Sequence, residues 1–117
     1  MKERYKNRIE LLQGTLDFMI LQALRRGAQH GFGISTVIRT NSHDAFQVPT
    51  GSLYPALHRM ERKGWIASSW EMAADKNREF KFYRLTAAGK KQLATEESKW
   101  KQLVAAIARM MRPAEEN

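Results

Sequence analysis

The segment from residue 48 to residue 66, VPTGSLYPALHRMERKGWI, contains the residues whose types and spacing most clearly suggest a chemical role. Leu53, Leu57 and Met60 recur at helical spacing, which predicts an amphipathic helix over residues 50–63 that ends at Gly64. Its outer side is expected to carry small, polar and basic residues: Ser52, Pro55, Ala56, Arg59 and Lys63. Small residues let a helix approach a groove closely, and arginine can reach a base edge or a phosphate. The pattern is therefore typical of a helix that enters the DNA major groove, with an ordinary surface helix as the alternative.

Catalysis and metal binding are not indicated by the sequence. The chain has no cysteine, which excludes disulfides, thiolate zinc sites and cysteine nucleophiles. Among its histidines, His58 lies three residues before Glu61, so a helix could present both to a metal ion, but no third ligand is evident. No GxSxG, Walker or HExxH motif is present, and Ser52 has no base near it in the sequence. We therefore expect a protein that is not an enzyme and that uses no metal or other cofactor.

The charge of the chain favours a polyanionic partner. Its 117 residues include 20 Lys and Arg against 12 Asp and Glu, a formal net charge of +8. Double-stranded DNA fits this charge, while a merely basic soluble protein is the alternative. The longest apolar runs are far shorter than the roughly 20 residues that span a bilayer, and the charged N-terminus does not resemble a signal peptide. The predicted N-terminal helix lacks a large apolar face, so we expect a cytoplasmic protein without membrane association.

Short elements, several of them ending at glycines, surround the predicted recognition helix. Helices are predicted over residues 2–12, from Thr15 to Gly27, and over residues 31–41, where His30 is expected to act as a cap and Phe32 to extend the apolar face. The aromatic segments WIASSWEM and EFKFYRL predict a β-hairpin with Lys76, Arg78 and Lys81 at or near its tip. Thr86 is expected to cap a last helix that runs to about Met111. This order predicts a mainly α fold with a small β-hairpin, a winged helix-turn-helix domain.

The last helix carries apolar residues in rows spaced by seven. Leu93, Trp100 and Ile107 form one row, Leu103 and Met110 a second, and Val104 and Met111 a third. This spacing suits packing against another helix, and a chain this short has little else to cover the face, so a second copy is the expected partner. Packing onto the chain's own first helices is the alternative. The predicted organisation is a DNA-binding domain over residues 1–85 and a dimerisation helix over residues 86–117, in one compact unit. The predicted interface comprises Leu93, Trp100, Leu103, Val104, Ile107 and Met111.

Five segments also resemble the PadR family of bacterial transcriptional regulators. They are LLQGTLDFMILQAL, HGFGIS, GSLYPALHRMERKGWI, FYRLTAAGKKQL and EESKW, which follow the family's order and spacing over roughly residues 11–100. The resemblance implies a winged helix-turn-helix homodimer that binds operator DNA, usually as a repressor. It places Ser52, Tyr54, Pro55 and Arg59 on the recognition helix, and Lys76, Arg78 and Lys81 on the wing. Phe32 and Ala28 depart from the family, which usually has tyrosine and proline at these positions.

Two further expectations concern an effector and the operator. Related regulators have an aromatic residue at the dimer interface, where some bind flat apolar effectors, so Trp100 with Phe18 or Val104 is a candidate effector site. The alternative is that Trp100 is a plain interface anchor. The two recognition helices of a dimer, related by its twofold axis, would reach successive major grooves about 34 Å apart. This arrangement predicts an inverted-repeat operator. The competing function is a winged-helix module that binds protein and not DNA.

Overall fold

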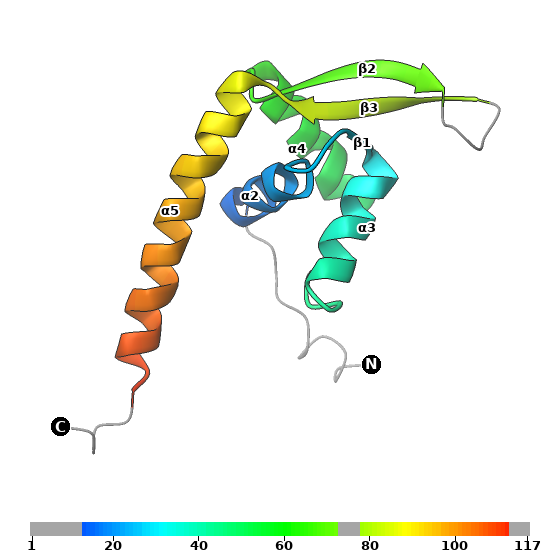
Figure 1. The fold of residues 1–117 in the computed structure, drawn as a ribbon. Helices are drawn as coiled ribbons and strands as arrows, with labels where there is room; N and C mark the ends of the chain where they lie inside the picture. Colours follow the sequence, from blue (N-terminus) through cyan, green and yellow to red (C-terminus); the bar gives the residue numbers. More distant parts are fainter. Residues whose placement is uncertain (1–12, 73–77, 113–117) are drawn as a thin grey trace.

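The computed structural model describes residues 13–72 and 78–112, and over this part the chain forms a winged-helix fold (Figure 1). The predicted helix over residues 2–12 and the tip residue Lys76 lie outside the described residues. The elements in chain order are α2 (Gln13–Ala23), β1 (Gln29–His30), α3 (Gly31–Asn41), α4 (Thr50–Arg62), β2 (Ile66–Met72), β3 (Glu79–Leu85) and α5 (Ala87–Met110). The mainly α fold with a hairpin wing is confirmed.

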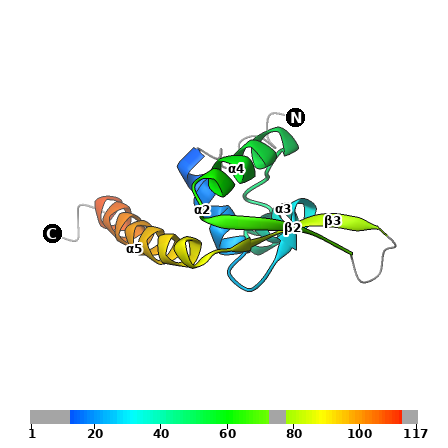
Figure 2. The ribbon, with the colours of Figure 1, turned by 90° about the horizontal axis from the view of Figure 1, so that it is seen from above.

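The wing belongs to a three-stranded antiparallel sheet, not to an isolated hairpin. The strand order is β1-β3-β2, and β1 pairs with β3 through Gln29↔Tyr83 and His30↔Phe82. Beyond β1 the two long strands project away from the helices as a ribbon (Figure 2). A strand of two residues has no sequence periodicity, so β1 could not have been predicted from the sequence pattern.

Helix α2 lies in the middle of the molecule, between α5 on one side and α3 and α4 on the other (Figure 1). The predicted apolar stripe is present, since Leu16, Ile20 and Leu24 are buried, but Phe18 and Leu21 are buried as well. The helix begins at Gln13, so Thr15 lies within it and is not its cap, and it ends at Ala23 before a turn that reaches Gly27. A helix with neighbours on several sides buries more than one stripe, which is why its apolar residues are not confined to one face.

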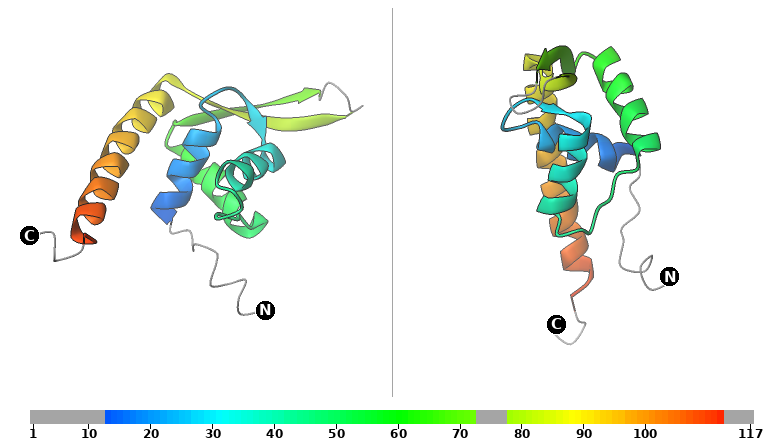
Figure 3. Two further views of the ribbon diagram at one scale, coloured as in Figure 1. Left: turned by 60° about the horizontal axis from the view of Figure 1, so that its bottom comes forward. Right: turned by 90° about the vertical axis from the view of Figure 1, so that its right-hand side faces the viewer.

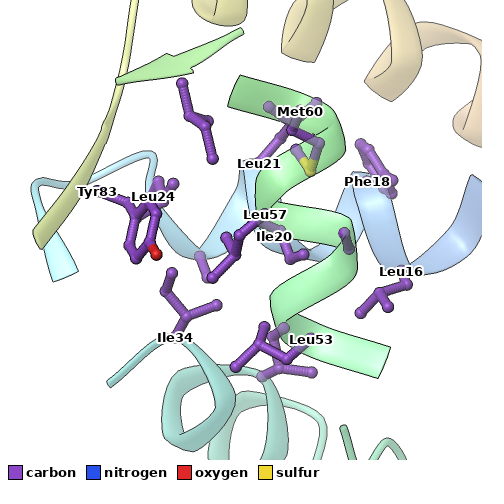
Figure 4. Packing of buried hydrophobic residues seen from close by; sticks show 14 of the residues in the cluster. Leu16, Phe18, Ile20, Leu21, Leu24, Ile34, Leu53, Leu57, Met60 and Tyr83 are labelled. Atoms are coloured by element: carbon purple, nitrogen blue, oxygen red, sulfur yellow. The ribbon is translucent and has the colours of Figure 1, made fainter. Parts of the chain in front are cut away.

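The core forms where α4 packs onto α2, α3 and the sheet. Leu53, Leu57 and Met60 from α4 meet residues from the other elements, including Ile34 and Tyr83 (Figure 4). Burial raises the pKa of the Tyr83 hydroxyl above its ordinary value, with smaller contributions from the charges of Glu61 and Tyr54. The phenol therefore remains neutral at physiological pH, as its position in the core requires.

Local interactions define the ends of the helices as predicted at three positions. His30 caps α3, because its Nδ1 accepts a hydrogen bond from the Gly33 N–H at 3.0 Å. Thr86 caps α5 in the same way, with its Oγ1 accepting from the Gly89 N–H at 3.0 Å. After α4, Gly64 adopts a left-handed conformation with φ of 78°, and the Trp65 N–H returns to the Met60 carbonyl at 3.1 Å. Glycine is favoured there because other residues pay a steric penalty in this conformation.

Replacing Gly89 with alanine is expected to destabilise the fold. Gly89 is buried in the first turn of α5 against the Trp65 carbonyl, and an added Cβ would lie only 2.9 Å from the Trp65 carbonyl carbon. Because the added Cβ would clash with backbone atoms of Trp65, the clash can be relieved only if α5 shifts away from the end of α4. We expect this shift to lower the free energy of unfolding by about 1–3 kcal/mol. Urea denaturation followed by circular dichroism measures the change. Gly14→Ala is the matched control, since a Cβ at Gly14 meets nothing within 4 Å. Equal stability of the two variants would contradict the prediction.

Candidate nucleic-acid interface

Helix α4 has no acidic side chain among its solvent-exposed residues. Its solvent-exposed residues are Thr50, Gly51, Ser52, Tyr54, Pro55, His58 and Arg62, followed by Lys63 at the C-cap. The one acidic residue of the helix, Glu61, is only half-exposed and accepts a hydrogen bond from Ser68 Oγ at 2.5 Å. The N-cap residue Pro49 gives no side-chain hydrogen bond to the first turn. The start of α4 is therefore small, uncharged and positive by its helix dipole, which suits an approaching phosphate.

The structure places four of the predicted recognition-helix residues on this face, but Ala56 is not among them. Ser52, Tyr54, Pro55 and Lys63 are exposed, and Tyr54 retains 40% of its accessible surface. Ala56 is only 1% exposed, so the prediction that it contacts DNA is wrong. Position 56 lies three residues after Leu53 and four before Met60, which places it within the buried stripe.

Arg59 was expected on the outer face, and this prediction is also wrong. Its Nη2 donates to Asp17 Oδ1 at 2.5 Å, and the two side chains are only 24% and 12% exposed. Its Nε is buried without a hydrogen-bond partner in the described part of the chain. Arg59 thus ties α4 to α2. This contact could not be predicted from local sequence patterns, because the two partners are 42 residues apart.

Breaking this ion pair is expected to lower the free energy of unfolding. Asp17→Ala leaves the partly buried guanidinium of Arg59 without its acceptor, and loss of a charged hydrogen bond costs about 1.5–3 kcal/mol. The double variant Asp17→Ala/Arg59→Met should lose less than the sum of the two single variants, because neither partner is then left unpaired. Urea denaturation of all four proteins measures the coupling, and purely additive losses would show that the pair does not hold α4 to α2.

The wing carries the second group of predicted residues. Arg78 is exposed, with its Cζ 5.1 Å from the Phe80 ring centroid, and Lys81 is half-buried, with its Nζ 5.8 Å from the Tyr83 ring. These cation–π contacts hold the charged ends close to the ribbon. On the wing, hydrogen bonds from Ser69 and then Arg84 hold the pKa of the Glu71 carboxyl below its ordinary value.

A hollow of about 410 Å³ lies in the corner between the wing, the start of α3 and α4. Seen from the wing end, α3 lies below the strands and α4 lies to one side of them (Figure 3). Aromatic residues line this corner, among them Phe32 at 73% exposure and Trp70 at 64%. Phe32 was expected in the apolar face of α3, and its exposure shows that this prediction is wrong. His58 of α4 also lines the corner and is exposed, as expected for a residue of this helix that faces solvent or DNA, whereas the spacing of apolar residues indicated no role for Trp70.

Helix α5 divides into two parts with different surroundings. Leu93 is 5% exposed in the chain's own core, so the prediction that it lies at a dimer interface is wrong. Trp100 is half-buried and stacks on Phe18 of α2, with ring centroids 5.7 Å apart and an interplanar angle of 16°. Beyond this point the helix extends away from the other elements (Figure 1). There it exposes a row of apolar side chains: Leu103, Val104, Ile107, Met110 and Met111.

A recognition helix supported by a second helix and flanked by a β-ribbon defines a winged helix-turn-helix protein. The profile of the Transcriptional regulator PadR-like family matches residues 20–95, and the chain belongs to this family. It is a transcriptional regulator, a class whose members are generally not enzymes. No helix in the described part of the chain combines the length and the apolar character needed to cross a bilayer.

Relatives of known structure share the whole architecture. A transcriptional regulator from Clostridium thermocellum is 26% identical, with a TM-score of 0.75 over 86% of this chain and 93% of its own. A PadR family transcription regulator from Clostridium difficile R20291 is 25% identical, with a TM-score of 0.72 over 83% of this chain and 98% of its own. By sequence, an uncharacterized protein of Lysinibacillus sphaericus is 28% identical over 96 residues, which are 82% of this chain and 87% of that protein.

Proposed function

We propose that this regulator is a repressor that binds an inverted-repeat operator as a homodimer. The observation that carries this proposal is the exposed face of α4, which shows no exposed acidic side chain and shares a corner of the molecule with Lys81 and Glu79 of the wing. In this arrangement α4 enters the major groove, where Ser52 and Tyr54 near its start meet base edges or phosphates. Lys63, Arg78 and Lys81 contact the phosphate backbone on either side of the groove, with Lys76 added from the wing tip.

The second half of α5 supports the homodimer. Leu103, Val104, Ile107 and Met111 expose between 47% and 76% of their surface in the single chain, although all are apolar. Exposed apolar patches of this kind mark interaction sites, and a twofold axis through them pairs each residue with the same surface of a second copy. Trp100 lies next to this row and borders the proposed interface. In this proposal residues 1–85 bind DNA and residues 86–117 dimerise, and the protein acts in the cytoplasm.

A flat apolar effector could bind beside Trp100. A hollow of about 260 Å³ adjoins this residue and is lined by Gly14, Thr15, Glu96, Lys99, Trp100 and Leu103. The Phe18 ring lies against Trp100, and Val104 is exposed one turn further along α5. These three residues form the proposed effector site, with the second copy closing it.

Selection of binding sites from a random duplex library tests the proposed function. We expect enrichment of an inverted repeat whose half-sites are about 10 base pairs apart from centre to centre, or a multiple of that spacing. In vitro transcription from a promoter that overlaps the selected site should fall as the protein is added. A rise in transcription would show that the protein is an activator and not a repressor. A library that shows no enrichment would favour the winged-helix module that binds protein.

A further inference from the structure

The backbone conformation at position 31 does not require a glycine, although Gly31 occupies it. It is the first residue of α3 and has ordinary helical geometry, unlike Gly27 and Gly64, whose φ angles are 153° and 78°. Alanine is intrinsically more favourable than glycine in a helix, so backbone conformation would favour a side chain at this position. The reason for glycine must therefore lie in the space around it.

That space is filled by the ring of Tyr54. A Cβ added to Gly31 would lie 2.8 Å from Tyr54 Cζ and 3.0 Å from its Cε1, closer than such atoms can approach, and it would collide with the hydroxyl oxygen as well. Gly31 is itself buried, while Tyr54 keeps 40% of its surface exposed at the corner between α4 and the wing. The hydroxyl end of the Tyr54 ring thus lies against the backbone of α3, while part of the side chain remains exposed.

The start of α3 cannot easily move away from this contact. The His30 ring holds the first turn through its hydrogen bond to the Gly33 N–H, and it packs against Phe80 and Phe82 with ring centroids 5.3 and 5.4 Å away. The backbone of His30 also pairs with Phe82 in the sheet. A methyl group at position 31 would therefore displace the Tyr54 side chain and leave α3 in place.

We infer that Gly31 is a positioning residue for DNA binding, whose missing side chain lets the Tyr54 ring lie in one orientation with its exposed surface toward the operator. This inference rests on the proposed function. A side-chain contact with DNA contributes most when the side chain is already held in the orientation in which it binds. Gly31 itself touches no DNA and acts through Tyr54.

The test is a cycle of Gly31→Ala, Tyr54→Ala and the double variant. Fluorescence anisotropy measures the affinity of each for the operator duplex selected by the wild type. We expect each single variant to bind about tenfold more weakly, a loss of about 1.4 kcal/mol. In the Tyr54→Ala background, Gly31→Ala should cause no further loss, because the ring that it displaces is gone. Gly33→Ala is the matched control, since its Cβ would meet the movable amide end of Gln29 and not Tyr54; it should retain the wild-type affinity.

The outcomes separate this inference from the proposed function. Wild-type affinity of Gly31→Ala, or losses that add in the double variant, would overturn the role of Gly31 while leaving DNA binding intact. If the wild type itself binds no duplex, both the inference and the proposed function fail. If Gly31→Ala does not fold, folding of the double variant supports the contact with Tyr54. A double variant that also fails to fold would show that the glycine is needed for another reason.

Discussion

Replacing both Leu103 and Ile107 with aspartate is expected to convert the protein from a dimer into a monomer and to lower its operator affinity at least a hundredfold. The two residues lie one helical turn apart on the exposed part of α5, with 47% and 48% of their surfaces accessible in the single chain. Burying an aliphatic side chain contributes about 1.5–3 kcal/mol, and twofold symmetry counts each residue twice. Because only about half of each side chain remains to be buried, the dimer dissociation constant should rise at least a hundredfold, which corresponds to about 2.8 kcal/mol.

Stability and assembly should respond differently to this change. Because both side chains already contact solvent in the single chain, the folded domain should lose little of its free energy of unfolding. Sedimentation velocity at low micromolar concentration measures assembly, and circular dichroism checks the fold. The control replaces Ser98 and Gln102 with aspartate, which adds the same charge at the same spacing on exposed positions away from the apolar row. A wild type that sediments as a monomer would contradict the proposed homodimer, and a Leu103/Ile107 variant as dimeric as the wild type would place the dimer interface elsewhere.

Operator affinity is expected to fall about a thousandfold or more when the salt concentration rises from 50 to 200 mM. A dimer that neutralises about six to ten phosphates releases as many condensed counterions, and this release weakens as the salt concentration rises. The net charge of +8 on each chain and the exposed Arg62, Lys63 and Arg78 provide the cations. Anisotropy titrations of the selected operator across this range give the slope of the logarithm of affinity against the logarithm of salt concentration.

Single substitutions should change this slope only where a cation contacts phosphate. Arg78→Ala removes one contact from each wing, so the magnitude of the slope should fall by about 2 for the dimer. Lys101→Ala removes an equally exposed charge from α5, away from the wing, and should leave the slope unchanged. An affinity that does not depend on salt would remove the electrostatic basis of the proposed function and would favour a protein partner.

The sequence alone determined helices α2 to α5, the two long strands of the wing and the class of protein. Helical spacing of Leu53, Leu57 and Met60 predicted α4 because these residues interact within one element, and the aromatic segments after Gly64 predicted the wing for the same reason. The caps at His30 and Thr86 were predictable because each bonds a backbone N–H only three residues away. Together with five family-like segments in order, these local signals were enough to indicate a winged-helix regulator.

Tertiary structure decided which of the candidate residues are available to a partner. Arg59 and Arg62 are alike in sequence, but only Arg59 meets Asp17, so it turns inward while Arg62 remains exposed. Likewise Leu93 and Ile107 belong to one row of sevenfold spacing, yet α2 and the sheet cover the first and leave the second bare. Periodicity identifies the face of a helix, but the neighbours that cover this face are brought together only by folding. For that reason the burial of Leu93 and the exposure of Ile107 could not be derived from the sequence.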